Sequence, residues 1–260
     1  MKRTTYIIIA LLAATLLLVV AGSLTVVHYA VPYTDDQIVL FDDEATEIPI
    51  PKFAHLTFTH NDWQSKVKGL TIVESDSVDT PIVRTGKNWK KYFECNLVGD
   101  TLAITGNYPK NLRIDPQQSK GKWLATIIVP RGMIRGVTNG WRILRLVDFQ
   151  SPQLNVESNI RVILIDCNID RFSSVSGSLE ELELENTHIE IADIRQPKDE
   201  LDIMCADSTS VINRMQITGS HRGDSHLNLL NANIGSMTWQ PVDTNAEINI
   251  IINKPAEIKF

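Results

Sequence analysis

The chain has 260 residues, of which 43% are hydrophobic and 22% charged, with 25 basic and 31 acidic residues and a net charge of −6. This composition supports a packed core and excludes a wholly disordered chain. The excess of acids argues against a nucleic-acid partner, which would need a basic face.

The first thirty residues contain one long apolar run. Lys2 and Arg3 precede it, and no further charge appears until Asp35. Twenty-two residues of helix span about 33 Å, and a bilayer core is about 30 Å thick. The leading basic pair favours a cytoplasmic N-terminus. The sequence therefore predicts a transmembrane helix or uncleaved signal anchor over 6–28. A cleaved signal peptide is the alternative.

An anchor of this kind implies a location and a division of the chain. The predicted location is the cell membrane, crossed once, with the bulk of the chain on the extracytoplasmic side. The membrane is then a partner through this helix. The predicted segments are a cytoplasmic stub over 1–5, the helix over 6–28, an acidic and proline-containing linker over 29–53 and a β domain over 54–260.

Short alternating segments fill the chain after residue 54. HLTFTH, LTIVES, YFECNLV and LATIIV are examples, and each is bounded by Gly, Pro, Asn or Asp. Apolar residues at every second position are typical of half-buried strands, and no long stretch here has a helical period with caps. The sequence predicts an all-β domain.

A phrase of alternating aliphatic residues recurs about every twenty residues. Its members start at Leu144, Val162, Leu182, Leu201, Leu227 and Ile248, at intervals of 18, 20, 19, 26 and 21. Ala125 extends the series back by 19, and isoleucine follows seven places after three of these starts, at Ile169, Ile189 and Ile234. A period near twenty is typical of repeat architectures, in which stacked turns of chain bury a shared column.

Two repeat folds fit this pattern. VILIDCNI, with Cys167, also fits a leucine-rich repeat, but the equivalent residues Thr187, Ala206 and Ala232 do not keep the Asn or Cys that such repeats use. We therefore expect a single-stranded parallel β-helix, a β-solenoid of right-handed sense, behind the transmembrane helix. A leucine-rich-repeat interaction protein is the alternative.

Three cysteines, Cys95, Cys167 and Cys205, do not make a disulfide scaffold. Cys167 and Cys205 lie about two repeats apart, and two layers of strands separate them by nearly 10 Å, beyond the limit of about 7 Å between bridged Cα atoms. Both are predicted to be small buried apolar residues.

The ends of a stack of strands need covers. Trp63 and Trp89 lie among lysines and predict a cover for the N-terminal end, while Lys254, Pro255 and Lys259 discourage further strand pairing at the other end.

The stretch from Gly69 to Gly106 contains a short strand, an acidic turn, a second strand and the phrase VGDTLAI. It resembles the start of the bacterial auto-transporter adhesin "head GIN" domains. The resemblance implies an exported β-helix, often lipid- or membrane-anchored, and brings no catalytic residues with it. The Gly-Ser-Gly runs usual in those domains are few here.

One tripeptide is a candidate ligand-binding site. Arg222, Gly223 and Asp224 lie in an insertion between two repeats, where loops project. An exposed Arg-Gly-Asp turn can present a guanidinium and a carboxylate to an integrin-like groove, whereas a plain polar turn uses the same residues. His221 and His226 flank it at a spacing of five, which does not fit a zinc pair, and we predict no metal site.

Outward carboxylates offer an alternative function. Asp166, Glu183, Asp202 and Asn228 can line up along one face, as in β-helix polysaccharide lyases and hydrolases. No nucleophile elbow, phosphate loop or zinc-protease motif is present. The sequence therefore predicts a membrane-anchored, non-catalytic binding or adhesin-like module, or an envelope structural module, without a cofactor. Its partner is a protein or glycan on the solenoid surface, and the alternative is a carbohydrate-active enzyme.

Overall fold

The computed structural model describes residues 12–23, 45–60, 69–87, 90–107, 125–140, 143–158, 160–174, 176–196, 200–219, 224–242 and 247–253. The chain divides into two compact units, Met1–Gln37 and Ile38–Phe260. The finer division into segments ending at 5, 28 and 53 stays a prediction.

The described part of the first unit is a helix over 12–23 with exposed apolar side chains. Within the described residues, no helix is long and apolar enough to cross a membrane. This finding contradicts the predicted transmembrane anchor over 6–28, the membrane as its partner, and the predicted single-pass location at the cell membrane.

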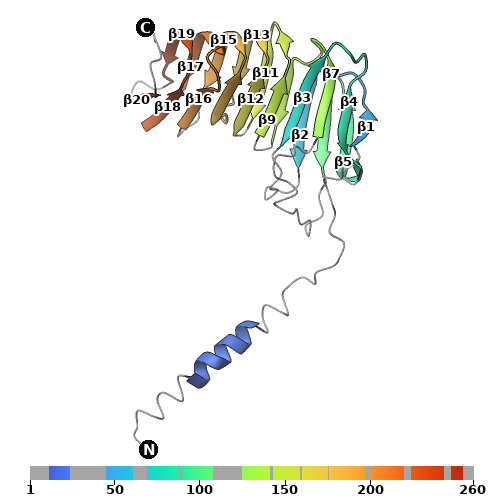
Figure 1. The fold of residues 1–260 in the computed structure, drawn as a ribbon, viewed down its shortest axis with the longest axis vertical. Coiled ribbons are helices and arrows are strands. Elements are labelled where there is room, and N and C mark those ends of the chain that lie inside the picture. Colours follow the sequence, from blue (N-terminus) through green and yellow to red (C-terminus); the bar gives the residue numbers. More distant parts are fainter. Residues whose placement is uncertain are drawn as a thin grey trace, which may run out of the picture. The chain divides into compact units, whose positions relative to one another are not determined.

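The second unit is built from strands in two ten-stranded sheets (Figure 1). Sheet A has the order β1-β4-β7-β3-β9-β12-β14-β16-β18-β20. Its strands are β1 (Ala45–Pro49), β4 (Ile82–Gly86), β7 (Ala125–Pro130), β3 (Leu70–Ser75), β9 (Ile143–Val147), β12 (Arg161–Ile165), β14 (Glu181–Glu185), β16 (Glu200–Cys205), β18 (Asp224–Leu230) and β20 (Glu247–Asn253).

Sheet B has the order β19-β17-β15-β13-β11-β8-β2-β6-β5, and β10 also pairs with β13. Its strands are β19 (Ile234–Gln240), β17 (Val211–Thr218), β15 (His188–Arg195), β13 (Asn168–Ser174), β11 (Leu154–Ser158), β10 (Gln150–Ser151), β8 (Gly136–Asn139), β2 (His55–His60), β6 (Thr101–Gly106) and β5 (Phe93–Val98). A 3₁₀ turn, η1 (Lys90–Tyr92), precedes β5.

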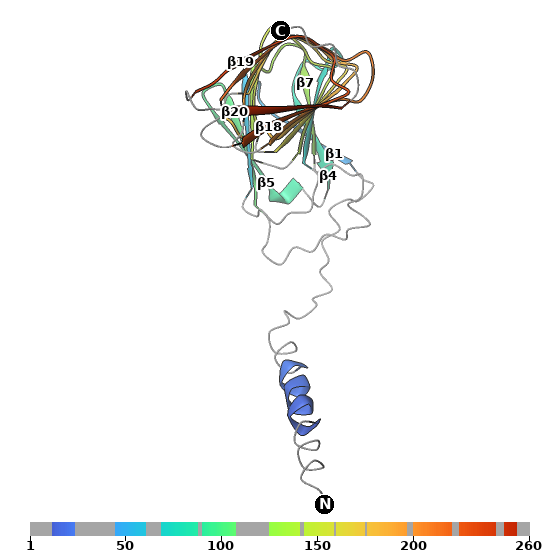
Figure 2. The ribbon, with the colours of Figure 1, turned by 90° about the vertical axis from the view of Figure 1, so that its left-hand side faces the viewer.

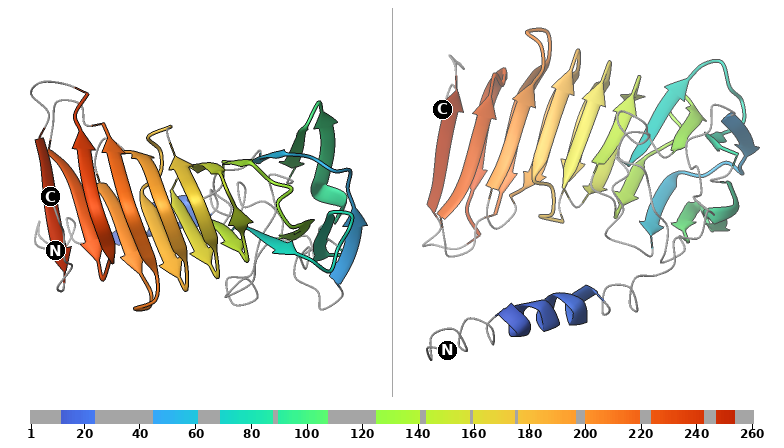
Figure 3. Two further views of the ribbon diagram at one scale, coloured as in Figure 1. Left: turned by 90° about the horizontal axis from the view of Figure 1, so that it is seen from above. Right: turned by 60° about the horizontal axis from the view of Figure 1, so that its bottom comes forward.

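From β8 to β20 the chain passes back and forth between the two sheets, and we call this the repeat region. Its strands pair in parallel with the equivalent strands of the preceding and following passes (Figure 3). Alternate side chains point inward from both sheets, which is why a period of two in the sequence becomes one shared core. Columns of aliphatic residues fill that core, among them Leu144, Val162, Leu182, Ile203 and Leu229, all essentially without exposed surface.

The strands before the repeat region are arranged differently, and we call β1–β7 the N-terminal strands. β3 inserts between β7 and β9, and β2 inserts between β6 and β8. β4 pairs antiparallel with both β1 and β7, and β5 pairs antiparallel with β6. Both sheets are therefore mixed.

These observations correct the expected fold. The all-β class is confirmed, but the single-stranded parallel β-helix behind a transmembrane helix is wrong. The described strands make two separate mixed sheets that do not close into one coil. The repeat signal fits this arrangement equally well, because passes between two sheets bury the same columns as closed coils do.

The structure also shifts the predicted repeat register. Leu182 pairs with Ile203, not Leu201, and Leu227 pairs with Ile250, not Ile248. A slip of two residues keeps every side chain on the same face, so the alternation pattern could not detect it. β3 also separates β7 from β9, which puts Leu70 rather than Ala125 beside Leu144.

A left-handed residue ends most strands of sheet A in the repeat region. Asp148, Asp166, Asn186 and Asn231 have φ values of 61°, 54°, 46° and 53°. Asp and Asn adopt this conformation more readily than other side chains. The backbone N–H of Asp148 donates to Ile165 O and that of Asp166 to Glu185 O, both at 3.0 Å. The corners at Asp148 and Asp166 are thus hydrogen-bonded to the pass that follows each of them.

Candidate functional site

A groove of about 540 Å³ lies on the outer face of sheet B. Strands β13, β15 and β17 supply most of its lining. The lining residues are Arg171, Asp193, Ile194, Arg195, Gln216, Thr218 and Val242.

Strand register brings the polar lining residues together. Asp193 pairs with Gln216, and Arg195 pairs with Thr218 on the neighbouring strand. Alternate residues of β15 face outward, while Ile194 between them is buried in the core. Two outward rows on adjacent strands therefore form one polar surface.

The two arginines of the groove differ in their ion pairing. Arg171 Nε lies 2.8 Å from Asp193 Oδ2, which leaves that pair neutral overall. Among the described residues, the exposed Arg195 has no ion-pair partner. A guanidinium presents several N–H donors in a planar fork that matches a carboxylate. The groove can therefore bind an anionic group, although the chain as a whole carries a charge of −6.

A row of carboxylates crosses the outer face of sheet A. Arg161 Nε lies 3.2 Å from Glu181 Oε1, and Arg161 also pairs with Glu183. Asn228 Nδ2 donates to Glu200 and, at 2.7 Å, to Asp202 Oδ1. Burial raises the pKa of the Glu181 carboxyl; Arg161 opposes this effect, and Glu183 and Asp202 add to it.

The predicted carboxylate alignment is only partly present. Asp202 and Asn228 are register partners, and Glu183 lies one strand away from Asp202 on the same face. Asp166 lies at a corner instead, where it accepts a hydrogen bond from Asn186. Glu183 and Asp202 are held by Arg161 and Asn228, so this row resembles a stabilised polar surface more than an acid and base facing a substrate.

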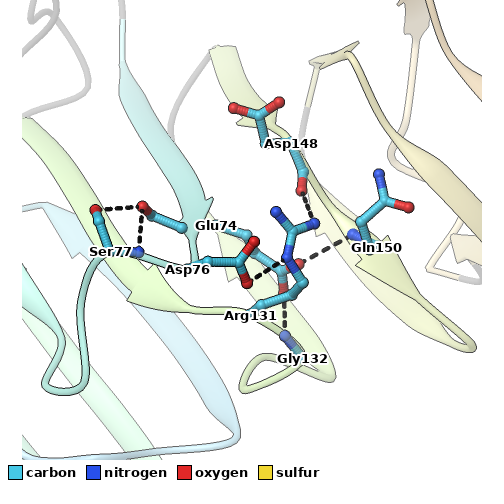
Figure 4. A network of polar contacts seen from close by, with 8 residues as sticks. Glu74, Asp76, Ser77, Arg131, Gly132, Asp148 and Gln150 are labelled. Atoms are coloured by element: carbon cyan, nitrogen blue, oxygen red, sulfur yellow. Dashed lines mark hydrogen bonds and ion pairs between the residues drawn. The ribbon is translucent and has the colours of Figure 1, made fainter.

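A third polar network joins the N-terminal strands to the repeat region (Figure 4). Glu74, at the end of β3, is only 1% exposed. Its carboxylate accepts the backbone N–H of Gly132 at 3.1 Å and that of Gln150 at 3.0 Å. These amides follow the two strands that flank β3, so one side chain ties both neighbours together.

Charges around Glu74 complete this network. Arg131 Nε donates to Asp76 Oδ1 at 2.7 Å, and this bond lowers the pKa of the Asp76 carboxyl. Burial raises the pKa of Glu74, although both backbone donors and Arg131 oppose the shift. The carboxylate of Glu74 is fully used by these amides, so we assign it a structural role.

The Arg-Gly-Asp tripeptide is described only at its end. Arg222 and Gly223 lie outside the described residues, as does His221. Asp224 is the first residue of β18, in register with Glu247. In the part of the chain that the structure describes, no group of three His, Cys, Asp or Glu residues could hold a metal ion.

The predictions for Cys167 and Cys205 are confirmed. Cys167 and Cys205 are buried and unbridged. Burial raises the pKa of the Cys167 thiol to about 12, which removes it as a nucleophile at neutral pH. Trp63, Trp89, Lys254, Pro255 and Lys259, predicted to lie at the covers, fall outside the described residues.

Sequence reasoning missed the groove entirely. A usable signal was present in IDRF, ADIR and NRMQIT, which place Arg, Asp and Gln at outward positions. Ile169, Ile189, Ile212 and Ile234 form one column in sheet B. Aligning the polar residues on that column would have brought the groove residues together.

Comparisons with known proteins show no family for this chain. No family model and no curated protein matches the chain. A "putative adhesin" from Bacteroides fragilis is 11% identical, with 84% of this chain and 96% of that chain covered and a TM-score of 0.43. A "putative adhesin" from Parabacteroides merdae is 13% identical, with 84% and 96% covered and a TM-score of 0.40.

A "putative lipid binding protein" from Parabacteroides distasonis is 15% identical, with 83% of this chain and 95% of that chain covered and a TM-score of 0.34. Two of these three neighbours carry an adhesin name and the third a lipid-binding name. They do not show membership of the head GIN group, and TM-scores below 0.5 carry no argument about the site.

Proposed function

We propose that this protein is a non-catalytic, adhesin-like binding module whose ligand is an acidic polymer. The groove on sheet B is its binding surface. Arg195 takes a carboxylate of the ligand, while Gln216 and Thr218 hydrogen-bond neighbouring polar groups. The observation that carries this proposal is a guanidinium without an ion-pair partner among the described residues, in a groove on an acidic chain.

Binding assays on the full chain test this proposal. The probes are an oligouronate, an oligoglutamate peptide and a neutral glucan of the same length. We expect binding of a carboxylate-bearing probe and not of the glucan. Arg195→Ala should weaken that binding by about tenfold or more, because one charge-assisted hydrogen bond contributes about 1.5–3 kcal/mol.

Arg214→Ala is the matched control. Arg214 lies on the same face of sheet B but outside the groove, and its Nη2 is paired with Glu190 Oε1 at 2.9 Å. The affinity of the Arg214→Ala variant for the carboxylate-bearing probe should stay within about twofold of that of the unchanged chain. Equal binding by the Arg195 variant and the unchanged chain would reject the groove as the site.

The carboxylates of Glu181, Glu183 and Asp202 that share the outer face of sheet A are the observation behind a second function, a carbohydrate-active enzyme acting on that face. Product analysis after long incubation with each glycan probe separates the two functions. Cleaved products that disappear in Glu181→Gln would overturn the non-catalytic proposal.

Binding of an integrin-like partner through Arg222, Gly223 and Asp224 stays a separate prediction, independent of the groove. Asp224→Glu keeps the charge and lengthens the side chain, so loss of integrin binding in that variant alone would support it. Arg195→Ala should leave such binding unchanged.

A further inference from the structure

The two sheets end differently at their two edges. On the N-terminal side, β1 and β5 are antiparallel to the strands beside them. On the C-terminal side, β20 and β19 pair in parallel with β18 and β17. Among the described residues, no strand lies beyond either of them, and Figure 2 looks onto this end of the sheets. Their outer backbone groups form a template for another strand.

The apolar columns are also left open at this end. Ile252 continues the column of Ile203 and Leu229, which are 0% exposed, yet Ile252 is 42% exposed. Ile248 and Ile250 pack only partly against the core. One more layer of strand would cover all three isoleucines.

The sequence of β20 is complementary to itself. Its seven residues are EINIIIN, and the inward positions 248, 250 and 252 are all isoleucine. In an antiparallel pair centred on position 250, Ile250 faces its own copy and Ile248 faces Ile252. Glu247, the one charged residue of β20, then faces Asn253, so no like charges meet.

We infer that a second copy of this chain docks on β20, antiparallel, about a twofold axis at Ile250. This arrangement extends sheet A through the dimer and joins the apolar columns of the two copies. A twofold contact uses the same edge on both copies, so it closes at two and does not propagate into a fibre.

Cysteine cross-linking in the full chain, kept in a mild detergent, tests this register. In a Cys95→Ser background, Ile250→Cys places each new thiol opposite its own copy, where side chains on facing strands approach within about 5.5 Å. We expect an interchain disulfide on mild oxidation. Ile248→Cys is the matched control, because position 248 faces 252, and it should cross-link at least about tenfold less.

A second variant separates pairing from folding. Adding Ile252→Lys to Ile250→Cys puts a charge at the inward edge and should remove most of the cross-link, whereas Asn249→Lys, on the outward face, should not. Circular dichroism confirms that both remain folded. Equal cross-linking at 248 and 250 would overturn the proposal. So would cross-linking at 250 that appears only after residues 254–260 are deleted, because the chain's own end would then cover β20.

Discussion

The N-terminal strands and the repeat region satisfy their strand ends by different means. In the repeat region, the corner N–H groups of Asp148 and Asp166 donate to backbone carbonyls of the next pass, Ile165 and Glu185, while that of Asn186 donates to the Asp207 carboxylate. At β3 the chain leaves the stack, so the amides of Gly132 and Gln150 reach the Glu74 carboxylate instead. A corner bonded to a backbone carbonyl needs no acceptor side chain, whereas the interruption at β3 and the corner at Asn186 each depend on a carboxylate.

Glu74 and Asp207 both accept backbone N–H groups, but their pKa values shift in opposite directions. Glu74 is buried, and burial raises its pKa above the ordinary value of 4.5. Burial also disfavours ionised Asp207, but bonds from Thr209, Asn186 and Ser210 outweigh it and hold its pKa well below 3.8. Stability therefore falls for Glu74 as the pH rises from 4.5 through its raised pKa. For Asp207 it falls as the pH drops below 3.8.

The largest expected effect comes from the core of the repeat region. Leu164 is 0% exposed and lies between Leu146 and Leu184 in one column. Leu164→Ala should lower the free energy of unfolding by about 3–5 kcal/mol, because the neighbouring passes cannot collapse into the cavity. Urea unfolding followed by fluorescence measures this change.

Ile252→Ala is the comparison at the open end. Ile252 is 42% exposed in the single chain, so at concentrations where the chain is monomeric truncation should cost below about 1.5 kcal/mol. Similar losses in the two variants at monomeric concentrations would mean that the single chain itself covers its last pass as tightly as the middle ones.

Glu74→Ala tests the carboxylate contact at the place where β3 interrupts the regular stack. It leaves two backbone N–H groups without their acceptor, and each orphaned donor costs about 1–3 kcal/mol. We expect a loss of about 2–4 kcal/mol in the free energy of unfolding, with faster proteolysis in the N-terminal strands. Glu185→Ala, at an exposed position of β14, is the control and should be near neutral. A neutral Glu74→Ala would show that other groups or water satisfy these amides.

Local alternation predicted much of the fold. The inward positions of β9, β12 and β14 follow directly from LRL, VIL and LEL, because a period of two fixes which side chains face the core. The pattern could not distinguish closed coils from passes between two sheets, and it could not detect a slip of two residues at Ile203. It also gave no sign that β3 inserts between β7 and β9, since that pairing joins residues more than fifty positions apart.

The candidate site was harder to predict than the fold. Arg171, Asp193 and Gln216 lie on three strands, and only the correct register makes them neighbours. The five-residue corner over 206–210 is longer than the other corners of the repeat region that lead from sheet A to sheet B, and it hides Ile212 from a search at fixed spacing. The Arg-Gly-Asp motif is visible in any sequence because its residues are contiguous, whereas a surface formed by separate strands has no such signature.

Asp207 gives a pH-dependent comparison of corner types. Its carboxylate accepts backbone N–H groups of Asn186, Thr209 and Ser210. Asp207→Ala should lower the free energy of unfolding at pH 7 by about 1–3 kcal/mol. The difference from the unchanged chain should shrink as the pH falls below 3.8, because the unfolded chain then binds a proton that the folded state, with its lower pKa, does not.

Urea unfolding at pH 7, 5, 3 and 2 follows this difference. Asp207→Asn cannot titrate but keeps one acceptor oxygen. Its loss in the free energy of unfolding at low pH should therefore differ from that of the alanine variant. Asp170→Ala, at an exposed position of β13, is the control for removing a surface carboxylate and should be near neutral at pH 7. A deficit for Asp207→Ala that is constant down to pH 2 would contradict the depressed pKa.

The smallest expected effect isolates backbone conformation at a corner. Asn231 is exposed and has a φ of 53°, so its substitution removes little packing. Asn231→Ala should cost about 1 kcal/mol, because a Cβ without a local hydrogen bond disfavours the left-handed region, whereas Asn231→Gly should be near neutral. Asn233→Ala, two residues on and also exposed but without a positive φ, is the matched control and should stay within about 0.5 kcal/mol. Equal costs for alanine at 231 and 233 would mean that the corner tolerates any φ, and that the recurrence of Asp and Asn there serves their side-chain bonds instead.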